Sequence, residues 1–241
     1  MNGLKISENP DLEEARKFLQ LMEDEIITAL FKRAHYMRND AVYREDGIEV
    51  PGFDGSYLDF LLSGTEKLHA LAGRFEDAGE VPFTDAARTE RNASRDHSSF
   101  PMGPSEINMN SVIFDAYMDA LADICADGDD GEYGWSALAD IEALSSISTR
   151  VHRGGILVAD VKYLQDPAKY SMCVALGNQQ EIMDCITNGA QEENVLARVS
   201  AKGERYGLDP RFIGNFYRDF IIKATKGVEV QRMFEIVPCG D

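Results

Sequence analysis

Two cations lie about three helical turns apart in one segment of a very acidic chain. Arg150 and Lys162 are twelve residues apart, and the segment between them is largely apolar. The formal net charge of −18 means that the protein as a whole has no general affinity for anions. The two cations are therefore either ordinary solvent-exposed side chains or part of a local anion-binding site. A local site would favour an enzyme that acts on a small carboxylated molecule.

Five further polar residues could share that site. Asn188 and Glu192 are four positions apart, and so are Thr225 and Glu229, so each pair projects from one face of its predicted helix. Arg16 lies near the apolar stripe of the first predicted helix. Taken alone, pairs with this spacing are more often solvated surface than ligand contacts. A shared function requires that the fold gathers them around a common void.

The balance of charges excludes two classes of partner. The chain has 42 acidic and 24 basic residues, with a pI near 4.6. Nucleic acids and anionic membranes need dense Lys and Arg, so neither is expected as a partner. The sequence contains no apolar run of about 18 residues, so no membrane-spanning helix is predicted. The polar N-terminal segment predicts a cytoplasmic protein, and the alternative is secretion with a signal peptide absent from this sequence.

The histidines and cysteines form no ligand set. The four histidines show no HxxxH spacing, and the four cysteines show no CxxC pair. No metal ion and no other cofactor is therefore predicted. In a chain of this length, such cysteines are expected to be reduced, mostly buried thiols. They are Cys125, Cys173, Cys185 and Cys239.

Helices must position these residues, because apolar residues recur with a helical period along most of the chain. Asn9, Pro10 and Asp11 are typical of a helix start. The prolines and polar residues of 77–109 predict an irregular loop, and its length indicates a mobile or functional segment. We expect an all-α, single-domain multi-helix bundle over residues 1–241. The predicted helices cover residues 10–37, 57–75, 111–126, 135–163, 166–174, 178–187, 189–206, 210–223 and 225–236.

Several motifs occur in a fixed order from about residue 10 to residue 232. They are Ile48-Glu49-Val50-Pro51, Gly55-Ser56-Tyr57-Leu58-Asp59, Ser148-Thr149-Arg150-Val151-His152, Val158-Ala159-Asp160-Val161-Lys162-Tyr163, Ile186-Thr187-Asn188-Gly189-Ala190-Gln191-Glu192-Glu193 and Thr225-Lys226-Gly227-Val228-Glu229-Val230. With these motifs the chain resembles the all-helical, eukaryotic-type chorismate mutases of fungi and plants. The resemblance implies a homodimer that rearranges chorismate to prephenate, a shikimate-pathway step of aromatic amino acid biosynthesis, without a cofactor.

The resemblance also implies roles for the residues at the carboxylate end of the substrate. Arg16 and Arg150 match the family's carboxylate-binding arginines, whose planar guanidinium groups suit carboxylates. Asn188 and Thr225 match polar residues that line the same end. This isomerisation is pericyclic and has no covalent intermediate, so it requires positioning and electrostatics instead of a nucleophile.

Three further residues match positions around the reacting bond and the ring hydroxyl. Lys162 matches the lysine that donates to the ether oxygen, and Glu229 matches the residue on the other side of that oxygen. Glu192 matches the acceptor for the hydroxyl. Because Glu229 can donate only while it is protonated, we expect activity to decline as the pH rises and Glu229 loses its proton.

The chain departs from the family in the spacing of its two central cations. The family places this arginine and lysine eleven residues apart, whereas Arg150 and Lys162 are twelve apart. Because each residue of an α-helix adds about 100° of rotation, a spacing of twelve places the two side chains roughly 120° apart around the helix axis. We hypothesise a π-type bulge at Gly154-Gly155 that absorbs one residue and restores the common face. A regular helix from 148 to 163 would refute this hypothesis.

The effector-binding pattern of the fungal family members is incomplete. This chain has Gly73-Arg74 where two arginines are expected, and Gly134-Trp135 where Gly-Ser is expected. The indole of Trp135 could fill the effector pocket, so we expect little or no response to tryptophan and tyrosine. A non-catalytic, chorismate mutase-like helical interaction protein is the alternative function. Conversion of chorismate to prephenate separates the two.

Overall fold

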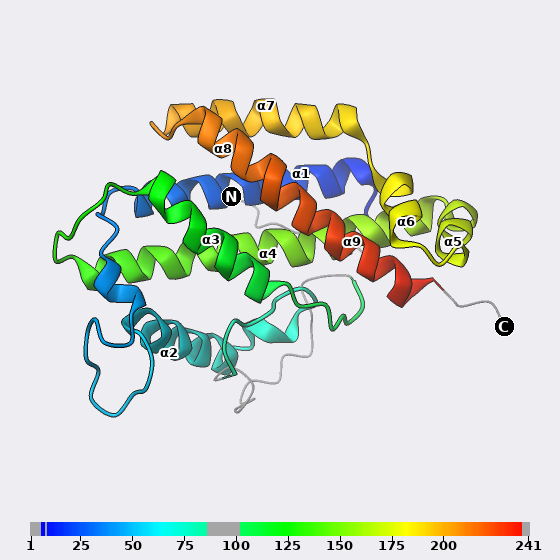
Figure 1. Ribbon diagram of the computed structural model, residues 1–241. Helices are drawn as coiled ribbons and strands as arrows, with labels where there is room; N and C mark the ends of the chain where they lie inside the picture. Colours follow the sequence, from blue (N-terminus) through cyan, green and yellow to red (C-terminus); the bar gives the residue numbers. More distant parts are fainter. Residues whose placement is uncertain (1–5, 8, 86–101, 238–241) are drawn as a thin grey trace.

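The computed structural model describes residues 6–7, 9–85 and 102–237, and all regular secondary structure in these ranges is helical (Figure 1). The predicted all-α fold is therefore confirmed. Short 3-10 turns cover Asp40–Tyr43 and Arg74–Glu76, and a π-helical turn covers Tyr217–Ile221. The α-helices are α1 Leu12–Arg33, α2 Tyr57–Leu71, α3 Asn110–Ile124, α4 Tyr133–Gln165, α5 Pro167–Ala175, α6 Gln179–Ile186, α7 Gly189–Arg205, α8 Pro210–Phe216 and α9 Ile222–Ile236.

Helix α4 forms the centre of the molecule. Its 33 residues make a rod about 50 Å long, with α1 packed along it and α9 crossing it (Figure 1). Apolar side chains on several faces of α4, including Leu144, Ile147, Val151 and Leu157, are completely buried. A helix that is apolar all round belongs in the interior, because any exposed face would leave apolar area in water.

The glycine pair of α4 does not form a bulge. Residues 133–165 are assigned as α-helix without a π-helical turn, so the hypothesis of an i→i+5 bulge at Gly154-Gly155 is wrong. The glycines allow close packing instead. A Cβ at residue 155 would lie 2.6 Å from the Cβ of Val228 on α9, and a Cβ at residue 154 would lie 2.7 Å from Cδ2 of Leu19 on α1. Both helices can therefore approach α4 more closely than any larger residue would permit.

The C-terminal helices differ from the prediction in one boundary. The predicted break between residues 223 and 225 is absent, because α8 continues through the π-helical turn Tyr217–Ile221 into α9. A π-helical turn accommodates an extra residue without ending the helix. Thr225 and Glu229 thus lie on one rigid segment.

Two buried polar clusters connect helices away from the cavity described below. Nε of Arg33 on α1 donates to Asp140 on α4 at 2.6 Å, and both side chains are fully buried. Tyr117 and Tyr43 donate their hydroxyl groups to the same carboxylate. In the second cluster, His152 accepts the backbone N–H of Met109, and burial lowers its pKa to about 4.

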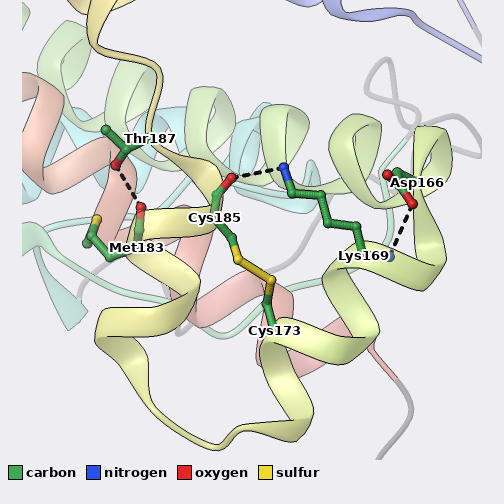
Figure 2. The surroundings of a disulfide bond; sticks show 6 residues. All are labelled: Asp166, Lys169, Cys173, Met183, Cys185 and Thr187. Carbon is green, nitrogen blue, oxygen red and sulfur yellow. Dashed lines mark hydrogen bonds between the residues drawn. A yellow bond between two sulfur atoms is a disulfide. The ribbon is translucent and has the colours of Figure 1, made fainter.

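The cysteine prediction is wrong for one pair. Cys173 on α5 and Cys185 on α6 form a disulfide (Figure 2). Cys125 is a free, buried thiol as predicted, and Cys239 lies outside the described residues. Sequence spacing could not reveal the bond, because α5 and α6 fold back on each other and bring together residues twelve positions apart.

The predicted irregular segment 77–109 is described only in part, since residues 86–101 lie outside the described ranges. Its described flanks contain no α-helix and are tied to helices. The N–H groups of Phe83 and Thr84 donate to Glu66 on α2, and Asn110 donates to the carbonyl of Val81. Among the helices of the described ranges, none is both long and apolar enough to cross a bilayer.

Candidate active site

A cavity of about 280 Å³ lies between α1, α4, α7 and α9, and its edge is formed by α5, α6 and the α6–α7 connection. Its wall therefore combines segments from both ends and the middle of the chain. All seven residues singled out in the sequence line this one cavity. They are Arg16, Arg150, Lys162, Asn188, Glu192, Thr225 and Glu229.

Arg150 is a buried guanidinium with few partners. It is 4% exposed, and its Nη1 donates to Oγ1 of Thr225 at 3.1 Å. Its buried Nε has no hydrogen-bond partner, and no carboxylate pairs with it within the described ranges. Burial lowers the pKa of this arginine, since a desolvated cation without a counterion is unfavourable. A bound anion would supply the missing partner.

The path of the Arg150 side chain explains how Arg150 and Lys162 reach the same cavity although they are twelve residues apart. Its Nη1 lies only 2.8 Å from the position that a Cβ would take at Gly154, so the guanidinium lies over that glycine, one turn closer to Lys162. Helical side chains usually point toward the N-terminus, and any larger residue at 154 would obstruct this path. A long side chain and a glycine therefore replace the bulge that the sequence suggested.

Lys162 and Glu229 form an ion pair at the cavity wall. Nζ of Lys162 donates to Oε2 of Glu229 at 2.7 Å and to the carbonyl of Ile186 at 2.8 Å. Both side chains are largely buried. Because Thr225 and Glu229 are one turn apart on α9, that helix presents one partner to each central cation.

The other carboxylates of the cavity are paired as well. Glu192 on α7 accepts from Lys226 on α9 at 3.0 Å. Glu23 on α1 accepts two hydrogen bonds from Arg198 on α7, at 2.7 and 2.8 Å. The bidentate geometry is the strongest form of this contact and fixes α7 against α1.

The cavity carries an excess of positive charge. Six cations line it, Arg16, Arg150, Lys162, Lys169, Arg198 and Lys226, against three carboxylates, Glu23, Glu192 and Glu229, which gives 6 − 3 = +3. Each carboxylate is paired with a cation. Among the described residues, Arg16, Arg150 and Lys169 therefore have no carboxylate partner. A local charge of +3 in a protein of net charge −18 indicates a site for an anion with more than one negative group.

Asn188 lies at the exposed rim of the cavity and also caps a helix. Its Oδ1 accepts the backbone N–H of Gln191 at 3.1 Å at the start of α7. Its amide nitrogen is the group left to donate toward a ligand. The side chain therefore has a structural role in addition to any contact with a substrate.

Several charged residues of the cavity were missed by the sequence reasoning. Lys226 lies inside a recognised motif, but its partner Glu192 is 34 positions away, so no local spacing reveals the pair. Arg198 and Lys169 belong to no motif that was identified. Only the folded arrangement shows that they share the cavity.

A second cavity of about 290 Å³ lies between α2 and α4. Arg74 contributes to its wall and donates to Glu80 at 3.0 Å and to Ser145 at 2.6 Å. Trp135 does not line this cavity, and its side chain is 62% exposed. The indole therefore does not enter this cavity of the single chain, and the expectation that it fills an effector pocket stays a prediction.

The fold and the first cavity define an all-helical protein with a site for a small polyanion. No family model matches the chain. The chorismate mutase of Schizosaccharomyces pombe is 35% identical over 242 residues, covering 93% of this chain and 96% of that protein. The chorismate mutase of Saccharomyces cerevisiae is 34% identical over 240 residues, covering 92% and 93%.

Solved structures agree with these relatives. Aro7p chorismate mutase from Candida albicans, in complex with L-Trp, has a TM-score of 0.88 and 30% identity, covering 96% of this chain and 93% of that one. AtCM1 with tyrosine bound in an allosteric site has a TM-score of 0.86 and 31% identity, covering 96% and 98%. The chain belongs to the chorismate mutase family of fungi and plants, which are intramolecular isomerases.

Proposed function

We propose that the first cavity binds chorismate and rearranges it to prephenate. The observation that carries this proposal is the buried Arg150 guanidinium, which lacks a carboxylate partner in a cavity of net charge +3. Chorismate supplies two carboxylates, so it offers counterions to Arg150 and Arg16. A buried cation that is left unpaired in the free protein repays its desolvation cost only when an anion binds.

The proposed rate enhancement comes from positioning and from charge stabilisation. Arg150 and Arg16 together hold the substrate in a compact, chair-like geometry, which removes much of the entropic part of the barrier. Nζ of Lys162 is placed to donate to the ether oxygen as negative charge develops on it, and the Glu229 side chain, held beside Lys162 at 2.7 Å in the free protein, takes the position on the other side of that oxygen. Glu192 accepts from the ring hydroxyl, and its pairing with Lys226 at 3.0 Å holds it in place. No nucleophile and no cofactor are required.

The decisive experiment follows the conversion of chorismate by the purified protein, with prephenate identified as the product. We expect turnover, and we expect Lys162→Met to lower kcat by about 10²- to 10³-fold, as removal of a transition-state donor does. Lys223→Met is the matched control, because Lys223 is an exposed lysine of α9 that pairs with Asp219 outside the cavity. Binding of chorismate without formation of prephenate would instead support the non-catalytic helical interaction protein.

The proposed response to aromatic amino acids is weak or absent. Related structures carry L-Trp, or tyrosine and phenylalanine in an allosteric site, so regulation is a property of those relatives. In this chain, Gly73 stands where an arginine is expected and has a φ of 79°, a conformation that disfavours any side chain. Arg74 is already engaged by Glu80 and Ser145. A several-fold change in rate with added tryptophan or tyrosine would contradict the proposal.

The assembly and the compartment are also proposals. We propose one catalytic domain that forms a homodimer, and the exposed apolar side chains of Leu68, Trp135 and Leu138 support a surface that is covered in the assembly. We propose a cytoplasmic enzyme, with secretion as the alternative. The Cys173–Cys185 disulfide favours the alternative, because such bonds persist mainly in oxidising compartments.

A further inference from the structure

The C-terminal end of α6 holds the ammonium groups of two lysines that line the first cavity. Nζ of Lys162 donates to the carbonyl of Ile186 at 2.8 Å. Nζ of Lys169 donates to the carbonyl of Cys185 at 3.2 Å, as Figure 2 shows. The last carbonyls of a helix lack intrahelical partners and carry partial negative charge. The position of this helix end therefore determines where two cavity cations lie.

A covalent bond fixes the same helix end. Cys185, whose carbonyl holds Lys169, is bonded through its sulfur to Cys173 on α5 (Figure 2). Lys169 lies on α5, one turn before Cys173. The disulfide and the Lys169 hydrogen bond thus connect α5 and α6 twice, once covalently and once through a cavity cation.

These two helices are short, and their other support is tertiary packing. Helix α5 has nine residues and α6 has eight, and helices of this length are not stable without tertiary support. They pack on a small apolar cluster that is separate from the main core and includes Tyr170, Ile182 and Met233. A cross-link between residues twelve positions apart adds a covalent constraint to this packing.

We propose that the Cys173–Cys185 disulfide is a positioning element of the active site and that its reduction weakens substrate binding. The inference rests on the proposed function. A dithiol reductant supplies two electrons and two protons. The S–S bond breaks, Cys173 and Cys185 become thiols, and the dithiol becomes a disulfide. The end of α6 is then free to move, and Lys162 and Lys169 lose their fixed carbonyl partners.

The first test establishes the bond and its structural effect without using turnover. Alkylation of the denatured protein should add two more groups after reduction than before it, and a non-reducing digest should contain a peptide that joins Cys173 to Cys185. Amide hydrogen exchange on the folded protein should accelerate across residues 179–188 after reduction, while exchange in α4 stays unchanged. An unoxidised pair, or unchanged exchange in α6, overturns the proposal whatever the chemistry of the cavity.

The second test measures kinetics with oxidised and reduced protein. We expect reduction to raise KM for chorismate by about fivefold, the effect of a weakened ion pair at a partly exposed site. The Cys173→Ser/Cys185→Ser double variant should resemble the reduced protein and should not respond to the reductant, which excludes action through Cys125 or Cys239. An unchanged KM in the reduced protein, or a double variant that still responds, overturns the proposal.

A third variant identifies the cation involved. Lys169→Met should raise KM in the oxidised protein by a similar factor, and reduction should then add less than it does in the unmodified chain. If accelerated exchange in α6 accompanies reduction but neither form converts chorismate, the proposed function fails while the mechanical role of the disulfide stands. Full additivity of Lys169→Met with reduction would refute the role of Lys169 in the coupling.

Discussion

Replacing Arg150 by methionine should stabilise the free protein and remove most of its activity. The guanidinium is 4% exposed, its Nε has no partner, and its single hydrogen bond goes to Thr225. Thr225 also donates to the carbonyl of Ile221, so its hydroxyl keeps a partner after the substitution. The change removes an uncompensated buried charge and leaves no polar group without a partner.

The substitution of Arg150 should change stability and activity in opposite directions. Exchange of a buried charge for an apolar group of similar size should raise the free energy of unfolding by about 1–2 kcal/mol. Loss of a desolvated charge pair with the substrate should cost about 3 kcal/mol, which is about a 10²-fold loss in kcat/KM. Urea unfolding without substrate measures the first effect, and the chorismate assay measures the second.

Arg33→Met is the matched control, because it makes the same change at a buried arginine that has a partner. Arg33 pairs with Asp140, and its removal leaves that carboxylate buried without its cation. We expect a loss of about 3–5 kcal/mol in stability. If Arg150→Met destabilises the free protein as strongly as Arg33→Met does, the description of Arg150 as an unpaired cation awaiting an anion is refuted.

Three further predictions concern packing and pH. Gly155→Ala should cost about 1–3 kcal/mol of stability and lower kcat/KM, because the new methyl group meets Val228 and displaces α9. Gly227→Ala is the control: a Cβ at this position meets open space, so the change should stabilise α9 slightly. Equal unfolding midpoints of the two variants would contradict this prediction. Burial lowers the pKa of His152 from 6.5 to about 4, so the unfolded chain binds a proton first as the pH falls. Between pH 7 and pH 4, the free energy of unfolding of the wild-type chain should therefore fall by roughly 3 kcal/mol more than that of His152→Gln. Parallel pH profiles of stability would disprove this role of His152. The amide of Glu229→Gln can donate to the ether oxygen at any pH, so this variant should keep its rate at high pH better than the unmodified chain does. Identical pH–rate profiles would remove the donor role of Glu229.

Helix positions were predictable because local signals agree with the tertiary structure. Asp11 caps α1, two residues beyond Asn9, where the sequence pattern begins, and Ser56 and Asp59 form a capping box at the predicted start of α2. All seven residues singled out in the sequence line the first cavity, and six of them, all but Arg16, lie in the recognised motifs. Their spacing alone could not show convergence, because convergence depends on how α1, α4, α7 and α9 pack.

The errors share one cause, which is that close approach between distant segments leaves no periodic signal. The disulfide depends on the fold-back of α5 on α6, and the glycine pair of α4 depends on contacts with Leu19 and Val228. The helical spacing of Arg150 and Lys162 predicted a bulge at Gly154-Gly155, because that argument assumes that each side chain projects straight out from the helix axis. The flexible Arg150 side chain instead reaches along the helix axis over Gly154.

The last α-helix has a consequence for synthesis of the protein. Thr225 and Glu229 line the first cavity and belong to α9, the last of the described helices. A nascent polypeptide therefore lacks part of the cavity until α9 has been synthesised. Products terminated before α9 would lack the side chains that contact Arg150 and Lys162, even if their earlier helices had begun to associate.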